Sequence, residues 1–196
     1  MYGVLMTDIG STTLTADDVS LIKQAQVGGI ILFARNVIDA AQVRRLCDDI
    51  RHYNPDILIG VDQEGGRVAR LRDGFTPLPA MGKLGKMFEQ SPSEALSCAY
   101  DCGYLMAAEV LAVGIDLSFA PVLDTDNIST VIGDRSFHQD ESPARYSDQT
   151  RNRRCSLERS TDFQLRQTAD GIARGTDRTR RSARARAGTF RAGACA

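Results

Sequence analysis

The 196-residue sequence contains no run of about 18 consecutive apolar residues, the length that a membrane-spanning helix requires. Its N-terminus lacks the basic residues that begin a secretory signal and reaches an acidic residue at Asp8. Its cysteines are odd in number and lack the spacing of a disulfide framework, so we expect reduced thiols at Cys47, Cys98, Cys102, Cys155 and Cys195. These absences predict a cytoplasmic protein with no membrane association.

Large apolar side chains are scarce beyond residue 150, where only Leu157, Phe163, Leu165, Ile172 and Phe190 occur. Burial of so few side chains does not offset an ordering cost of roughly 1–2 kcal/mol per residue. The charge also changes, from a net −9 over residues 1–150 to a net +8 over 151–196, where all 12 basic residues are Arg. These differences predict a folded domain over 1–140 and an irregular or disordered, Arg-rich tail over 141–196.

Apolar runs alternate with helical patterns within residues 1–140. We expect strands at 4–6, 30–33, 57–61 and 117–123. We expect helices that begin at Thr15, at Asp39 (in a capping box with Gln42) and at Ser91 (in a capping box with Glu94), and that end at Gly28, Asn54 and Val113. In the second helix Val43, Leu46, Cys47 and Ile50 share one face.

Buried strands joined by amphipathic helices are typical of a parallel α/β sheet. The pattern alone is compatible with an open doubly wound sheet and with part of a (β/α)8 barrel, whose complete form requires roughly 250 residues. In both architectures sites form where strands end. Polar residues follow all four apolar runs, at Asp8, 35–36, 62–67, Arg70, Asp124, Asp126 and 133–138.

The segment V-D-Q-E-G-G-R-V-A-R-L at 61–71 has the most informative pattern. A carboxylate after a buried strand, two glycines that let the backbone approach a ligand, and two arginines suit a neutral polyol or sugar. On residue type alone, a structural ion pair between Asp62 and Arg70 is favoured over a ligand site. A glycosidase pair of Asp62 and Glu64 is not favoured, because the sequence gives no spacing between their carboxylates. The glycines also lack the G-x-G-x-x-G pattern of a dinucleotide loop.

Four other residues have side chains that are often catalytic or metal-binding, but their positions in the sequence favour structural roles. His52 lies at a helix end and is expected at the surface, and His138 is expected to form a structural hydrogen bond. Cys98 and Cys102 lie four residues apart on a helix without a second pair of zinc ligands nearby, so core packing is favoured.

Five blocks together resemble glycoside hydrolase family 3, specifically the bacterial cytoplasmic β-N-acetylhexosaminidases of peptidoglycan recycling. They are G-G-I-I-L-F-A-R-N at 28–36, I-G-V-D-Q-E-G-G-R-V-A-R-L at 59–71, G-F-T-P-L-P-A-M at 74–81, L-S-F-A-P-V-L-D at 117–124 and S-T-V-I-G-D-R-S-F-H at 129–138. The resemblance implies the N-terminal half of a (β/α)8 TIM barrel, with about four parallel strands.

The resemblance also implies an activity, the removal of terminal N-acetylglucosamine from muropeptides with retention of configuration. It implies a monomer that needs no metal or other cofactor. By motif, Asp62 would bind sugar hydroxyls, and Arg70 and Arg135 would complete a polar wall around the same sugar. For these three residues the resemblance reverses the structural interpretation.

The resemblance stops near residue 140. The family continues with a K-H-F-P-G-H-G strand, an acid/base His and an Asp nucleophile, but here no Lys follows Lys86 and no His follows His138. The Arg-, Ala- and Gly-rich sequence that follows resembles the translation of a shifted reading frame, and we place the shift at about 141–150. We therefore expect no catalytic residues and no activity from this chain alone.

Two alternatives remain open. The Arg-rich tail could neutralise nucleic-acid phosphates, although only Phe163 and Phe190 are available there for stacking. The folded part could instead be a non-catalytic sugar-binding remnant.

A half barrel is also expected to expose an inner apolar face and to leave 30–33 and 57–61 poorly covered.

Overall fold

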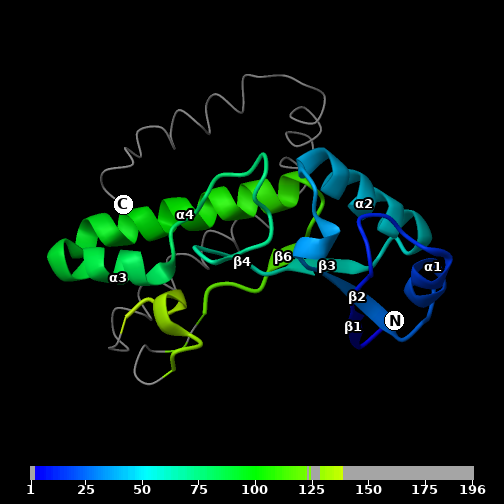
Figure 1. Cartoon of the computed structure of the whole chain (residues 1–196), viewed down its shortest axis with the longest axis horizontal. Coiled ribbons are helices and arrows are strands. Elements are labelled where there is room, and N and C mark those ends of the chain that lie inside the picture. Colours follow the sequence, from blue (N-terminus) through cyan, green and yellow to red (C-terminus); the bar gives the residue numbers. More distant parts are fainter. Residues whose placement is uncertain (1–2, 123, 125–128, 139–196) are drawn as a thin grey trace.

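The computed structural model describes residues 3–122, 124 and 129–138, which contain both strands and helices (Figure 1). The strands are β1 (Leu5–Thr7), β2 (Val27–Leu32), β3 (Leu58–Val61), β4 (Gln63–Gly65), β5 (Val68–Ala69) and β6 (Leu117–Ser118). The helices are α1 (Ala16–Ile22), α2 (Ala40–Tyr53), α3 (Met81–Gln90) and α4 (Pro92–Ala112), with short 3-10 turns η1 (Ala34–Asn36) and η2 (Gly133–Arg135). The expected tail over 141–196, and the nucleic-acid interpretation that depends on it, lie outside the described residues.

Four strands form one parallel sheet in the order β1-β2-β3-β6. In its centre Ile30 pairs with Ile59, and Leu32 pairs with Val61. This confirms the predicted parallel α/β sheet of about four strands. A separate antiparallel hairpin, β4–β5, follows β3 directly and was not predicted.

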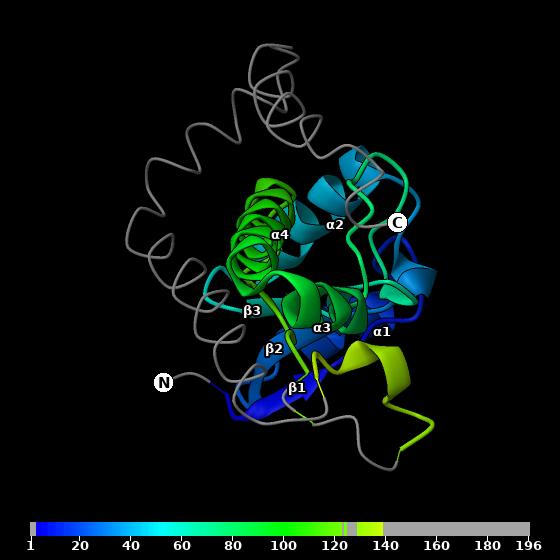
Figure 2. The ribbon, with the colours of Figure 1, turned by 90° about the vertical axis from the view of Figure 1, so that its left-hand side faces the viewer.

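One face of the sheet carries the hydrophobic core. Ile30, Leu32, Ile59 and Val61 are fully buried in one cluster with residues of α2 and α4. Figure 2 shows these two helices together on one side of the strands. The expectation that 30–33 and 57–61 are poorly covered is therefore wrong for the residues on the helix-covered face.

The opposite face is open. Because successive strand residues point to opposite faces, Leu58 lies on that side while its neighbour Ile59 lies in the core. Leu58 is 48% exposed, Met6 41% and Phe119 45%. The predicted exposure of an inner apolar face is confirmed for these alternate positions.

All three predicted helix starts are confirmed, but one predicted end is wrong. Thr15 caps α1 in a reciprocal capping box with Asp18, and the buried face of α2 consists of the predicted residues together with Gln42. However, α1 ends at Ile22 rather than at Gly28, because Gly28 and Gly29 belong to β2. Their missing side chains leave room for Gly3 and Met6 beside β2.

Neither of the two predicted capping boxes, at Asp39 and at Ser91, forms. The Asp39 side chain accepts a hydrogen bond from the backbone N–H of Gln42 at 2.7 Å. The Gln42 side chain does not return to Asp39, because it accepts from Ile38 N and donates to Thr12 O and Asn36 O. Ser91 precedes α4 without a side-chain capping bond, and Pro92 occupies the first helical position.

Two regions differ from the predicted pattern. No helix was predicted where α3 lies, because its two glycines lower helix propensity; packing against α4 and η2 compensates. Strand β6 ends at Ser118, and Pro121 lacks the N–H that further pairing would need. Within the described part of the chain, no helix is both long and apolar enough to span a bilayer.

Candidate functional site

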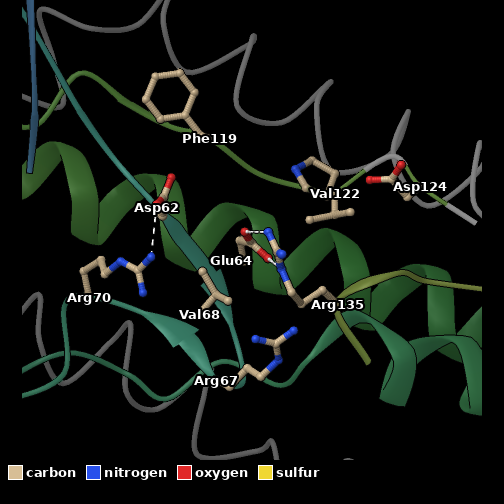
Figure 3. A pocket seen from close by; sticks show the side chains of 10 residues that line it. Asp62, Glu64, Arg67, Val68, Arg70, Phe119, Val122, Asp124 and Arg135 are labelled. Atoms are coloured by element: carbon tan, nitrogen blue, oxygen red, sulfur yellow. Dashed lines mark hydrogen bonds and ion pairs between the residues drawn. The ribbon is translucent and has the colours of Figure 1, made fainter. Parts of the chain in front are cut away.

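A cleft of about 470 Å³ lies where β3 and β6 end. Its lining comes from the end of β3, the β4–β5 hairpin, the segment after β6 and η2 (Figure 3). The lining residues are Asp62, Glu64, Arg67, Val68, Arg70, Phe119, Pro121, Val122, Asp124 and Arg135. The structure therefore brings the three predicted site residues, Asp62, Arg70 and Arg135, into one cleft.

Asp62 and Arg70 face one another across the base of the hairpin. Asp62 directly follows β3 and Arg70 directly follows β5, and Arg70 Nη2 lies 3.1 Å from Asp62 Oδ2. Each side chain is about one-quarter exposed. The ion pair that residue types predicted is confirmed, and both members remain accessible from the cleft.

Arg135 is held by Glu64. Arg135 Nη2 donates to Oε1 at 2.7 Å and Arg135 Nε donates to Oε2 at 2.9 Å. The hydrogen bonds to Glu64 raise the pKa of the Arg135 guanidinium above its ordinary value, and the charges of Glu64, Asp62 and Asp124 act in the same direction. Both Glu64 oxygens are therefore committed to a counter-ion, a role that the sequence did not reveal.

Other predicted polar residues divide between the rim of the cleft and separate contacts. Arg67 donates to the Val131 carbonyl and lies 3.5 Å from Asp134 Oδ1, with both side chains more than half exposed. Asp8 and Arg35 pair with one another and are not among the lining residues. Asp126 lies outside the described residues.

The two glycines of the 61–71 segment serve protein packing, which corrects the prediction that they admit a ligand. Gly65 has φ +108°, and a Cβ there would overlap the Pro79 carbonyl oxygen. A Cβ on Gly66 would lie 2.7 Å from the Ala80 Cβ. The glycines let the segment around residues 78–80 pack against the hairpin.

The sequence interpretation missed the apolar wall of the cleft, formed by Val68, Phe119, Pro121 and Val122. The strand register places Phe119 in this wall, because Leu117 pairs with Gly60 and residues two apart point to the same side. Asp62 and Phe119 each lie two residues beyond that pair. A polar and an apolar surface thus adjoin in the cleft.

None of the remaining candidates lines the cleft, and His52, Cys98 and Cys102 lie where they were expected. His52 is exposed beside the Tyr53 ring, and His138 lies 3.5 Å from a carboxylate oxygen of Glu89. Cys98 and Cys102 are buried in the core of the described region. Among those residues no group of three or more His, Cys, Asp or Glu side chains could hold a metal ion.

Comparison with known proteins identifies the family. The model for the "Glycosyl hydrolase family 3 N terminal domain" matches residues 5–147. A β-hexosaminidase from Pseudomonas aeruginosa is 54% identical over 145 residues, which are 74% of this chain and 42% of that protein. One from Thiobacillus denitrificans is 50% identical over 140 residues, 70% of this chain and 39% of the relative.

Solved structures agree with this assignment. NagZ from Neisseria gonorrhoeae, in complex with N-trifluoroacetyl-D-glucosamine, has a TM-score of 0.77 at 39% identity, over 79% of this chain and 47% of that one. A family 3 β-N-acetylglucosaminidase from Paenibacillus has a TM-score of 0.71 at 31% identity, over 77% and 29%. This chain spans less than half the length of the curated relatives that it matches. The chain belongs to glycosyl hydrolase family 3, and the two curated relatives named above are β-hexosaminidases.

Proposed function

We propose that the cleft binds the terminal, non-reducing N-acetylglucosamine of muropeptides in cell-wall recycling. Asp62 accepts hydrogen bonds from sugar hydroxyls, and Arg70 and Arg135 donate to sugar oxygens. The observation that carries this proposal is the convergence of these three side chains, from the separate segments 61–71 and 129–138, on one cleft.

The chemistry of the cleft suits a neutral sugar. Arg70 and Arg135 are each paired with a carboxylate within the cleft. The charges of these two arginines are therefore compensated. Its polar groups can exchange hydrogen bonds with hydroxyls, while Phe119, Pro121 and Val122 offer an apolar surface to the C–H groups of the ring. The Neisseria relative, which was solved with a glucosamine derivative, supports the same ligand class.

We further propose that this 196-residue chain does not hydrolyse the glycosidic bond by itself. Retaining hydrolysis requires a nucleophile and a proton donor near the anomeric carbon. The family resemblance places these groups after a K-H-F-P-G-H-G motif, which the 196 residues do not contain. A cytoplasmic location and independence of metals and other cofactors are part of the same proposal.

Isothermal titration with N-acetylglucosamine tests the binding proposal. The wild-type chain should release or absorb heat on binding, and Asp62→Ala should abolish it. Asp48→Ala is the matched control, because Asp48 is 58% exposed on α2 and pairs with Arg44. The binding proposal is wrong if wild type shows no saturable heat, or if both variants lose it equally.

A release assay with 4-nitrophenyl N-acetyl-β-D-glucosaminide tests the proposed inactivity. Wild type and Asp62→Ala should both remain at the rate of the buffer alone. Turnover by wild type above that of Asp62→Ala would contradict the proposal.

A further inference from the structure

We infer that Gln63 is a positioning residue for sugar binding, because its side-chain amide holds Arg70 in place opposite Asp62. The inference rests on the proposed function of the cleft and adds a residue to it. Gln63 is not among the lining residues, so it would act through Arg70 rather than by touching the sugar.

The Gln63 amide binds the backbone on both sides of the Arg70–Leu71 peptide. Its Oε1 accepts from Arg70 N at 2.9 Å and from Leu71 N at 3.1 Å. Its Nε2 donates to Leu71 O at 3.0 Å. The residue is 3% exposed, so these bonds do not compete with bulk water. The oxygen and the nitrogen of one side-chain amide thus fix the direction in which the chain leaves β5.

Gln63 is itself anchored to the sheet. Its backbone N–H donates to Ser118 Oγ at 3.0 Å, and that hydroxyl donates to Gln63 O at 3.0 Å. Ser118 belongs to β6, which pairs with β3. A continuous set of hydrogen bonds therefore runs from β6 through Gln63 to Arg70.

Arg70 depends on this support more than the other arginines of the cleft. Within residues 3–122, 124 and 129–138, its guanidinium has one protein partner, Asp62 at 3.1 Å, and its buried Nε has none. Arg135, by contrast, is held at two nitrogens by Glu64. A single contact at the tip of a long side chain leaves its orientation to be set by the backbone from which it starts.

The loop beyond Arg70 has an independent anchor. The Glu109 carboxylate on α4 accepts from Thr76 N at 3.0 Å and from Thr76 Oγ1 at 2.7 Å. Loss of the Gln63 amide should therefore loosen residues 70–71 without releasing the whole loop.

Only an amide satisfies this position. It accepts from two N–H groups and donates to a carbonyl, whereas Gln63→Glu would place an acceptor against Leu71 O and Gln63→Leu would supply neither function. We expect each substitution to weaken N-acetylglucosamine binding by about tenfold, as measured by isothermal titration. Ser118→Ala should weaken it less, because the Gln63 side-chain bonds remain.

Gln42→Leu is the matched control. Gln42 is the other buried glutamine of the described region, and its amide also makes three backbone hydrogen bonds, to Thr12, Asn36 and Ile38. Because it lies outside the cleft, its loss should lower the melting temperature as Gln63→Leu does but leave sugar affinity unchanged. Equal losses of affinity would assign Gln63 a general structural role and overturn the inference.

A double-mutant cycle tests whether Gln63 acts through Arg70. In an Arg70→Ala background, Gln63→Leu should cause no further loss of affinity. An additional loss of the same size would show that Gln63 acts by another route. If Gln63→Leu does not fold, Ser118→Ala takes its place in the cycle with the same expectation.

A readout without sugar separates this inference from the proposed function. In ¹⁵N-edited NMR, Gln63→Leu should shift the Arg70 Nε–Hε resonance and raise amide hydrogen exchange at residues 70–71, whereas Gln42→Leu should do neither. An unchanged resonance and unchanged exchange in Gln63→Leu would overturn the positioning role. An absence of sugar heat in wild type would instead remove the proposed function.

Discussion

The Arg135 guanidinium and the Glu64 carboxylate form a bidentate ion pair, with N···O distances of 2.7 and 2.9 Å, between residues that are 71 positions apart in the sequence. Glu64 lies on the hairpin that follows β3, and Arg135 is the last residue of η2. The ion pair therefore joins the hairpin and η2, which both line the cleft. The Glu64 side chain is 6% exposed and that of Arg135 is 23% exposed. At such burial, removal of one partner leaves the other without compensation.

Glu64→Gln should lower the free energy of unfolding by about 2–4 kcal/mol, because Arg135 then remains partly buried without its counter-ion. Urea denaturation followed by circular dichroism measures this loss. Asp134→Asn is the control, since the Arg67–Asp134 pair is 3.5 Å apart and more than half exposed. That substitution should cost less than about 1 kcal/mol. Equal costs would contradict a special role for Glu64.

Gly65→Ala should destabilise the chain by about 1–3 kcal/mol, because Gly65 has φ +108° and a Cβ there would overlap the Pro79 carbonyl. Gly10→Ala provides the comparison, because a Cβ at Gly10 would meet nothing within 4 Å. Thermal melts of the two variants measure the difference. A Gly65→Ala variant as stable as Gly10→Ala would show that the hairpin and the 78–80 segment are not in close contact.

The two faces of β3 should respond differently to truncation. Ile59→Ala should cost about 2–5 kcal/mol, because Ile59 is fully buried beneath the helices. Leu58→Ala should cost less than about 1 kcal/mol, since Leu58 is 48% exposed. Equilibrium unfolding in urea compares these neighbouring residues.

The open face also predicts self-association. Leu58→Gln should reduce light scattering of the chain at a fixed concentration, because it removes an exposed apolar group from the face that also carries Met6 and Phe119. Tyr53→Gln is the control, since Tyr53 is similarly exposed at the end of α2. An equal effect of both substitutions would argue against association through the open sheet face.

The sequence predicted much of the fold because its local signals agreed with the tertiary structure. The apolar stripe of α2 and the N-cap at Thr15 are each encoded within a few residues. Helix α3 and the β4–β5 hairpin were missed because neighbours decide them: α3 contains two glycines, one of which closely approaches the backbone at Phe137.

The candidate site likewise contains contacts that the sequence indicated and contacts that it did not. The Asp62–Arg70 pair spans only eight positions, and its chemistry was visible in one segment. The Glu64–Arg135 pair and the Ser118–Gln63 link join distant segments, so no local pattern could indicate them. The apolar wall was hidden for another reason, because Phe119 and Val122 have residue types that equally predict a core strand.

Cys47 provides a test of burial that depends on pH. Burial raises the pKa of its thiol to about 12 from an ordinary value of 9.0, although the positive charge of Arg51 opposes the shift. The folded chain therefore keeps this proton up to a pH near 12, whereas the unfolded chain releases it near pH 9.0. Between these values the unfolded state binds fewer protons, so stability falls as the pH rises. The slope contributed by this thiol is at most about 1.4 kcal/mol per pH unit.

Below pH 9 the Cys47 contribution should be constant, and a Cys47→Ala variant should be less stable there because it leaves a cavity beneath α2. From pH 9 to 11 the wild type should lose stability more steeply than the variant, which has no thiol at this position. Urea unfolding at half-unit pH intervals measures both slopes. All other ionisable residues are common to both chains, so their contributions cancel in the difference. Parallel slopes would mean that the Cys47 thiol ionises as readily in the folded chain as in the unfolded one, and hence that water reaches it beneath α2.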